Sequence, residues 1–338
     1  MGNAFAKKRE RSPSTQFSLN SSSSHNNQLF FHQEEILDVA AVDSESVVIG
    51  GGDSNASIVN LAKREATRVF DRHKKAVLKV AYSNELQAGL SSSRDATVYM
   101  WSYPTCSDVL QAFNGHSLAV TGLSLNCDVT RLATGSRDNS VMIWDVRTAS
   151  RVAQRAVSRN IVTHICWCAN SENEFVQTSE DKVVRVWDQR TTDVVQQFPM
   201  QRHIQTHCDT SDDAHFVLTS NSGTNGGECS VTLWDRRQTA IIRKFIGHKS
   251  VVNRAVFLKN KFTGCIASCA SDSVIKLWDV NTGNCHVSKY VDGAASLTSL
   301  CVVDSRRLVC GSQRRGVNIF EMNRNGDENC TLNHIENL

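Results

Sequence analysis

Short stretches of strand-forming residues, separated by turns rich in Gly, Ser, Asn and Asp, run through most of the chain. From Leu29 onward the apolar positions come in brief β-rich runs, and no amphipathic pattern of helical length stands out. Prolines, which interrupt strand pairing, occur in this part at Pro104 and Pro199 alone. The pattern predicts an all-β protein.

One motif recurs along this part of the chain: an aspartate, then an apolar run that ends on tryptophan. The tryptophans are spaced 43, 43, 47 and 44 residues apart, at Trp101, Trp144, Trp187, Trp234 and Trp278. A step of 42 residues reaches Val59 before the first copy and Phe320 after the last, so seven units are predicted. A Gly-rich insertion at residues 223–227 disturbs the aspartate of the fifth unit.

A histidine turn lies about thirty residues before several of these tryptophans. Gly115-His116 and Gly247-His248 are complete copies, while His32 and His73 lack the glycine. This order of histidine turn, small-residue strand, aspartate turn and Trp-Asp resembles the WD40 repeat over residues 29–322. The resemblance implies a seven-bladed β-propeller in which each repeat forms a four-stranded blade.

The resemblance also implies a hydrogen-bonded network inside each blade, in which the indole N–H, a Ser or Thr hydroxyl, the histidine and the turn aspartate are joined. Its members here are expected to be His73, Asp95, Trp101, His116, Thr134 (or Ser136), Asp138, Trp144, Asp181, Trp187, Trp234, His248, Asp272 and Trp278. We interpret the His–Asp pairs as structural, because a set that repeats around a ring does not mark a single active site.

A closed ring needs one terminus to supply the last outer strand, since an open ring leaves two sheet edges exposed. The spacing of residues 28–31 to His32 favours an N-terminal closing strand, and residues 330–335 are the alternative. The predicted organisation is therefore a flexible tail over 1–27, a propeller over 28–322 and a C-terminal tail over 323–338.

Composition limits the cellular compartments and the classes of ligand that we expect for this propeller. Of the 338 residues, 40% are apolar and 21% charged, which suits a folded core, and no apolar run is long enough to span a membrane. The N-terminus has no apolar run to serve as a secretory signal, so the 12 cysteines are expected to be reduced thiols in the cytosol or nucleus, and a cytoplasmic location is expected. The formal net charge of +3 equals that of residues 1–11, so the rest of the chain is neutral. We therefore do not expect it to bind nucleic acid; a local basic patch on the surface is the alternative.

The first residues resemble an N-myristoylation site at Gly2, except that Ala6 stands where Ser or Thr is usual. One acyl chain holds a membrane only marginally, and a basic cluster adds a second attraction to anionic lipid. That cluster is Lys7, Lys8, Arg9 and Arg11. We expect reversible peripheral membrane contact here; the alternative is an ordinary start in which Gly2 has no role.

Propellers of this family bind partner proteins mostly on the face where the aspartate turns and the inner strands begin. The resemblance places two sets of residues there. Residues of the turns are Arg94, Arg137, Arg159 and Glu180, and residues that begin inner strands are Thr121, Thr163, Gln205 and Asn253. Arg94 and Arg137 fall on adjacent blades and are suited to grip a carboxylate; the alternative is that they are solvated turn residues.

Several segments, such as residues 134–146, 157–167 and 177–182, are similar in order and content to the WD repeat-containing protein 31 family. That resemblance implies a non-enzymatic scaffold at the cilium and ciliary base. Its implied partners are intraflagellar transport components, the cargo-adaptor coat and small-GTPase-activating proteins. We therefore expect protein partners, no cofactor and no small-molecule substrate.

Two other classes of function, a ubiquitin-ligase receptor and an enzyme, are alternatives to the scaffold. Trp-Asp-x-Arg endings at Arg147, Arg190 and Arg237 also occur in substrate receptors of cullin ubiquitin ligases. Enzyme motifs for phosphate loops, zinc helices and nucleophile elbows do not occur. A metal site built from His164, Cys166 and Cys168 is conceivable, but all three suit a strand packed between blades, so no metal is expected.

Overall fold

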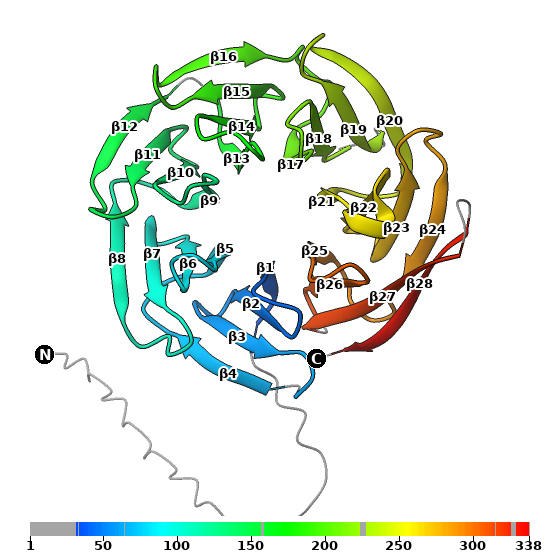
Figure 1. Cartoon of the computed structure of the whole chain (residues 1–338), viewed down its shortest axis with the longest axis horizontal. Helices are drawn as coiled ribbons and strands as arrows, with labels where there is room; N and C mark the ends of the chain where they lie inside the picture. Colours follow the sequence, from blue (N-terminus) through cyan, green and yellow to red (C-terminus); the bar gives the residue numbers. More distant parts are fainter. Residues whose placement is uncertain are drawn as a thin grey trace, which may run out of the picture.

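Seven four-stranded antiparallel sheets are arranged as blades around a central axis (Figure 1). The computed structural model describes residues 32, 34–63, 65–156, 159–223, 228–314, 316–325 and 329–337. Each blade uses four consecutive strands, with the first nearest the axis and the fourth at the rim. The arrangement confirms the seven-bladed β-propeller that the repeats predict. The described residues include no helix long and apolar enough to cross a membrane.

The strand boundaries follow the repeat closely. Blades 1 to 3 comprise β1 (Ile36–Ala41), β2 (Ser46–Gly51), β3 (Ala56–Asn60), β4 (Glu65–Phe70), β5 (Val77–Ser83), β6 (Ala88–Ser93), β7 (Thr97–Ser102), β8 (Val109–Asn114), β9 (Val120–Leu125), β10 (Arg131–Ser136), β11 (Val141–Asp145) and β12 (Arg151–Arg155). Blades 4 and 5 comprise β13 (Val162–Trp167), β14 (Glu174–Ser179), β15 (Val184–Asp188), β16 (Asp193–Gln197), β17 (Gln205–Thr210), β18 (Phe216–Asn221), β19 (Cys229–Asp235) and β20 (Ala240–His248). Blades 6 and 7 comprise β21 (Val252–Phe257), η1 (Asn260–Phe262), β22 (Cys265–Ala270), β23 (Val274–Asp279), β24 (Cys285–Tyr290), β25 (Leu297–Val302), β26 (Arg307–Ser312), β27 (Val317–Asn325) and β28 (Asn329–Asn337).

Burial decreases from the second strand of a blade to its rim. All six residues of β6 are buried, whereas β4 and β12 are mostly exposed. Small residues dominate β6 because large side chains of its neighbours fill the space. A Cβ on Gly89, for example, would lie 2.1 Å from the indole of Trp101, so glycine is required there.

The repeat tryptophans pack between neighbouring blades. Trp144 of blade 3 is 2% exposed and belongs to a core cluster with Leu90, Met100 and Phe113 of blade 2. Each blade alone would leave such an apolar surface in water, so the ring depends on contacts between neighbours.

The last blade is closed by the C-terminal strand. β28 pairs antiparallel with β27 from Asn325↔Asn329 to Asn318↔Asn337 and forms the outer strand of blade 7. The preference for residues 28–31 in that position is therefore wrong, and the C-terminal alternative is correct. Residues 323–325 and 329–337, predicted to lie in a C-terminal tail, therefore belong to the propeller, because a strand that follows its partner directly in sequence pairs with it more simply than a distant terminus does. The tail predicted over 1–27 lies outside the described residues.

Candidate partner-binding face

Two kinds of loop emerge on one side of the ring, which we call the recognition face. They are the turns between the second and third strands and the connections from each outer strand to the next inner strand. In every blade a backbone hydrogen bond joins the two loops. The seven donor–acceptor pairs are Gly52–Glu35, Arg94–Ala76, Arg137–Ala119, Glu180–Ile161, Ser222–Ile204, Ser271–Val251 and Gln313–Ser296. Each blade therefore holds its own two loops of the recognition face together through the backbone.

In blade 3 a chain of side chains connects this face to the core. The Trp144 indole N–H donates to Thr134 Oγ1 at 2.8 Å, and Thr134 Oγ1 lies 2.8 Å from His116 Nε2. His116 Nδ1 is 3.0 Å from Asp138 Oδ2. For each group of this network to donate to the next, the Thr134 hydroxyl must donate to His116 Nε2 and the His116 Nδ1–H must donate to the Asp138 carboxylate. The structure selects Thr134 over Ser136, whose hydroxyl bonds the Leu118 carbonyl.

Blades 2 and 6 repeat this geometry with serine in place of threonine. Their members are His73, Ser91, Asp95 and Trp101 in blade 2, and His248, Ser268, Asp272 and Trp278 in blade 6. Each of the three aspartates also accepts the backbone N–H that follows the histidine, at 2.8–3.0 Å. The network therefore fixes both loops of the recognition face at once.

Three blades use different residues for the same purpose. In blade 1 the hydroxyl comes from the third strand: His32 bonds Asp53 at 2.8 Å and Ser57 at 2.5 Å. In blade 4 Arg185 replaces histidine at Asp181, at 2.8 Å, and Trp187 donates to Gln177 at 2.7 Å. Blade 5 keeps the bond from Trp234 to Thr219, at 3.0 Å. Ser57, Gln177 and Arg185 were not predicted from the sequence, because they depart from the histidine and the second-strand hydroxyl of the repeat pattern.

The turn aspartates are expected to make the recognition face sensitive to acid. Burial raises the pKa of Asp138, but hydrogen bonds from His116 and Ser140 outweigh burial and hold the pKa below its ordinary value of 3.8. Because the folded pKa is the lower one, this stabilisation is present above about pH 4 and is lost as pH falls toward the folded pKa. Asp138→Asn should be less stable than wild type by about 1–3 kcal/mol at pH 7 and should lose less stability between pH 5 and 3. Urea unfolding at a series of pH values measures the stability at pH 7 and its loss between pH 5 and 3. If the stabilities of wild type and Asp138→Asn fell in parallel with pH, Asp138 would not be the source of the acid sensitivity.

The residues expected to begin inner strands carry contacts between blades. Thr121 donates to the Val162 carbonyl, Thr163 to the Gln205 carbonyl at 2.6 Å, and Asn253 to the Leu297 carbonyl at 2.5 Å. Gln205 itself is 1% exposed, and the position equivalent to Thr121 and Thr163 is Thr206. These polar groups hold neighbouring blades together, so they are less available to a partner than the sequence suggested.

The turn residues, in contrast, present charge to solvent. Eight cations occupy the recognition face of blades 2 to 5, and we call this set the basic arc: Arg72, Lys74, Lys75, Arg94, Arg137, Arg159, Lys182 and Arg202. Seven are exposed, and Lys182 is half-buried. The exposed acidic residues on the same face of these blades are Asp71 and Glu228, and Glu180 is half-buried. Asp95, Asp138 and Asp181 have side chains that are 7%, 11% and 8% exposed inside their networks. The arc is therefore strongly positive at its surface.

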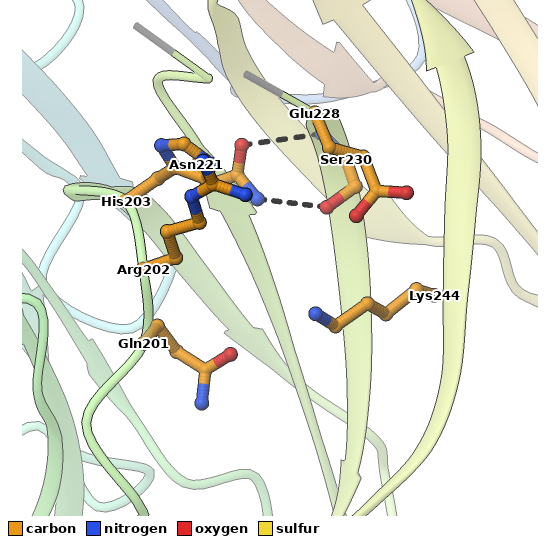
Figure 2. Close-up of a pocket in the computed structure, with 7 residues that line it drawn as sticks. All are labelled: Gln201, Arg202, His203, Asn221, Glu228, Ser230 and Lys244. Atoms are coloured by element: carbon orange, nitrogen blue, oxygen red, sulfur yellow. Dashed lines mark hydrogen bonds between the residues drawn. The ribbon is translucent and has the colours of Figure 1, made fainter.

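A small polar pocket lies at the end of the arc, between blades 4 and 5 (Figure 2). It encloses about 60 Å³, and Arg202, His203, Glu228 and Lys244 are among the residues that line it. Asn221 bonds Ser230 on its wall at 2.7 Å. Burial and the Arg202 charge lower the pKa of His203, so that His203 is neutral at physiological pH. The pocket has room for the end of one side chain rather than for a cofactor.

Along the axis, a buried ionic cluster joins four blades. Asp38 of blade 1 accepts from Arg254 of blade 6 at 2.6 Å, from Ser299 of blade 7 at 2.7 Å and from the Val80 N–H of blade 2 at 3.0 Å. Burial lowers the pKa of the nearby Lys79 ammonium, while Asp38 opposes that change. The cluster stabilises the ring where its first and last blades meet.

The metal site considered from sequence does not assemble. The His164 ring lies against His207, with centroids 4.0 Å apart; Cys166 Sγ lies 3.9 Å from Asp209; and Cys168 Sγ lies 3.6 Å from Arg236. Burial lowers the pKa of His164 and raises that of Cys166. These side chains are packing elements with different partners.

The membrane-contact residues lie outside the described residues: Gly2, Lys7, Lys8, Arg9 and Arg11. The lipid anchor therefore stays a prediction.

Comparisons with known proteins agree with the propeller. A family model described as "Nucleolar protein 10-like, N-terminal domain" matches residues 46–225, which is more than half of the chain, and "WD domain, G-beta repeat" matches residues 239–279. A "WD repeat-containing protein 89 homolog" of Dictyostelium discoideum is 33% identical over 79 residues. That match covers 22% of this chain and 21% of the relative, so the matched part is about a fifth of the relative's length. The finer resemblance to the WD repeat-containing protein 31 family stays a prediction.

Proposed function

Since the chain belongs to the WD-repeat β-propellers of the Nucleolar protein 10-like family, we propose that it is a non-enzymatic scaffold that binds an acidic segment of a partner protein on the basic arc. WD40 propellers typically bind other proteins. The observation that carries the proposal is the concentration of eight cations on the recognition face of blades 2 to 5, in a body whose net charge is close to zero.

Two features make the arc suitable for protein recognition. In blades 2 to 4 its loops are anchored by the aspartate networks, so these cations are presented on a rigid surface and little ordering is needed on binding. Leu118 and Met200 are 53% and 68% exposed on loops of the same face, in blades 3 and 5. An acidic segment with apolar side chains therefore matches the arc in both charge and hydrophobicity.

The His–Asp pairs support a structural role rather than catalysis. In blades 1, 2, 3 and 6 the same pair recurs, and in each the second ring nitrogen meets a serine or threonine hydroxyl. In blades 2, 3 and 6 that hydroxyl already accepts from the tryptophan. A hydroxyl committed in this way is a poor nucleophile.

Charge reversal tests the proposal directly. Arg94→Glu/Arg137→Glu should weaken partner capture from a nuclease-treated lysate of ciliated cells at least tenfold, because two exposed cations become anions on the binding surface. The matched control, Lys63→Glu/Arg306→Glu, changes charge equally on loops of the opposite face. Equal capture by both variants would contradict the proposal, and loss of capture on nuclease treatment would assign the arc to nucleic acid.

The cellular setting follows from the resemblance to the WD repeat-containing protein 31 family. We infer that the scaffold serves cilium assembly, with intraflagellar transport components, the cargo-adaptor coat and small-GTPase-activating proteins as partners. A lipid on Gly2 and the adjacent basic residues would hold it on the membrane of the ciliary base. Localisation of full-length protein and of Gly2→Ala in ciliated cells tests this setting. Ciliary-base enrichment that Gly2→Ala loses supports it, whereas nucleolar enrichment, suggested by the name of the matching family, overturns it.

One observation favours a ligase receptor as a second candidate. Arg190 and Arg237 fold back on Asp188 and Asp235, at 2.6 and 3.0 Å, but Asp145 pairs with Arg131 and leaves Arg147 exposed. Arg147 borders a cavity of about 670 Å³ between blades 2 and 3. Recovery of the cullin adaptor by wild type but not by Arg147→Ala, with Arg190→Ala as control, would support this function; recovery of transport or coat subunits alone would exclude it.

A further inference from the structure

Three side chains that can ligate a metal ion meet between blades 6 and 7, on the side opposite the recognition face. Cys265 begins β22, His286 lies in β24 and Cys330 lies in β28. One ligand atom from each residue lies within 4.8 Å of the other two. No other group of three His, Cys, Asp or Glu residues is this close in the part of the chain that the structure describes.

The donor set and its geometry suit zinc. Tetrahedral Zn²⁺ has bonds of about 2.3 Å to sulfur and about 2.0–2.1 Å to imidazole nitrogen, which places its ligand atoms about 3.5–4 Å from one another. The three ligand atoms therefore need to approach by at most about 1 Å. We propose that Cys265, His286 and Cys330 bind one Zn²⁺ ion, with a water molecule as the fourth ligand.

The surroundings of the cluster support a buried metal. Cys265 and Cys330 are 2% and 8% exposed, and the His286 side chain is 13% exposed. Two thiolates offset the double charge of Zn²⁺, so the ion can be buried without net charge. Both cysteines are free thiols at the edge of the apolar core cluster between these blades, so neither is committed to a disulfide.

His286 has unused bonding capacity. Its Nε2 is buried without a hydrogen-bond partner, and the nearest carboxylate oxygen, Asp279 Oδ2, lies 3.6 Å away. Asp279 Oδ1 is already engaged by the N–H and the hydroxyl of Thr282, at 2.6 and 2.9 Å, which turns Oδ2 toward the imidazole. With Nδ1 as the zinc ligand, the remaining Nε2–H is the one that faces Asp279, and a carboxylate on that second ring nitrogen orients the ring and strengthens it as a ligand.

The ion would link the ring-closing strand β28 to blade 6. β28 is the outer strand of blade 7, and the outer strand β24 of blade 6 lies beside it (Figure 1). Zinc held by Cys330 from β28, Cys265 from β22 and His286 from β24 would fasten blade 7 to blade 6. The three residues are separated by 21 and 44 positions in sequence, so no local spacing revealed them.

Metal analysis of the full chain tests the site. The protein, stripped with a chelator under reducing conditions and dialysed against Zn²⁺, should retain one zinc per chain, with a raised melting temperature. Cys265→Ser and Cys330→Ser should each lose most of that zinc. Cys285→Ser, an exposed cysteine beside His286, is the matched control and should retain it. No stoichiometric zinc in wild type, or full retention in both serine variants, would overturn the proposal.

Cobalt provides a readout that needs no substitution. Wild-type protein loaded with Co²⁺ should show the strong visible absorption of tetrahedral cobalt and a thiolate-to-metal charge-transfer band. A weak, octahedral spectrum without charge transfer would overturn the proposal. The result is independent of partner binding on the opposite face, so it does not bear on the proposed scaffold function.

Discussion

Replacing Asp38 with alanine is expected to lower the free energy of unfolding by about 3–5 kcal/mol, because the change leaves a buried charge without its partner. The Asp38 side chain is 3% exposed and accepts from Arg254, Ser299 and the Val80 N–H. These groups belong to blades 6, 7 and 2. Removal of one carboxylate therefore disturbs four blades around the seam where the ring closes.

Urea unfolding at pH 7 measures this change. Asp212→Ala is the control, since Asp212 pairs with Lys259 at 2.5 Å but the two side chains are 62% and 60% exposed, and such a pair is worth about 0–1 kcal/mol. Adding Arg254→Met to Asp38→Ala should recover part of the loss, because no buried charge is then unpaired. A loss below about 1 kcal/mol for Asp38→Ala would show that the axial cluster does not hold the ring.

Trp144→Ala is expected to cost about 3–5 kcal/mol, the range for truncation of a large buried aromatic side chain. Trp144 is 2% exposed, packs against residues of blade 2 and donates to Thr134. Its loss opens a cavity between two blades and removes one end of the chain that leads to His116 and Asp138. Both stability and the order of the recognition face should decrease.

Trp144→Phe separates the two contributions. It keeps much of the packing and removes the indole donor, so it should cost less than the alanine variant. Tyr290→Ala, at a position that is 61% exposed, should change stability by no more than about 0.5 kcal/mol. Equal unfolding midpoints for Trp144→Ala and Tyr290→Ala would contradict the role of the tryptophans between blades.

The number of blades could be predicted because the information is local and repeated. Trp101, Trp144, Trp187, Trp234 and Trp278 recur at nearly constant spacing, and each blade is one repeat. Closure of the ring could not be decided in the same way. Residues 28–31 and 330–335 both have strand-forming character, and the choice between them depends on the β27–β28 hairpin, whose pairing is a property of the assembled blade.

The candidate site was predictable where residues act within one repeat. Arg94 and Arg137 lie in turns whose position follows directly from the aspartate motif. Thr121, Thr163 and Asn253 were correctly placed on inner strands, but their bonds to the next blade depend on how blades pack. Asp38 and Arg254 are 216 residues apart, and the Cys265, His286 and Cys330 cluster joins three strands, so only the closed ring reveals them.

Cross-linking mass spectrometry of the captured complex, with a reagent that joins lysines to carboxylates, tests the central claim most directly. If an acidic partner segment lies on the basic arc, its Asp and Glu residues should be joined to Lys74, Lys75 and Lys182. Cross-links concentrated instead on Lys63 and Lys261, in loops on the opposite side of the ring, would contradict it.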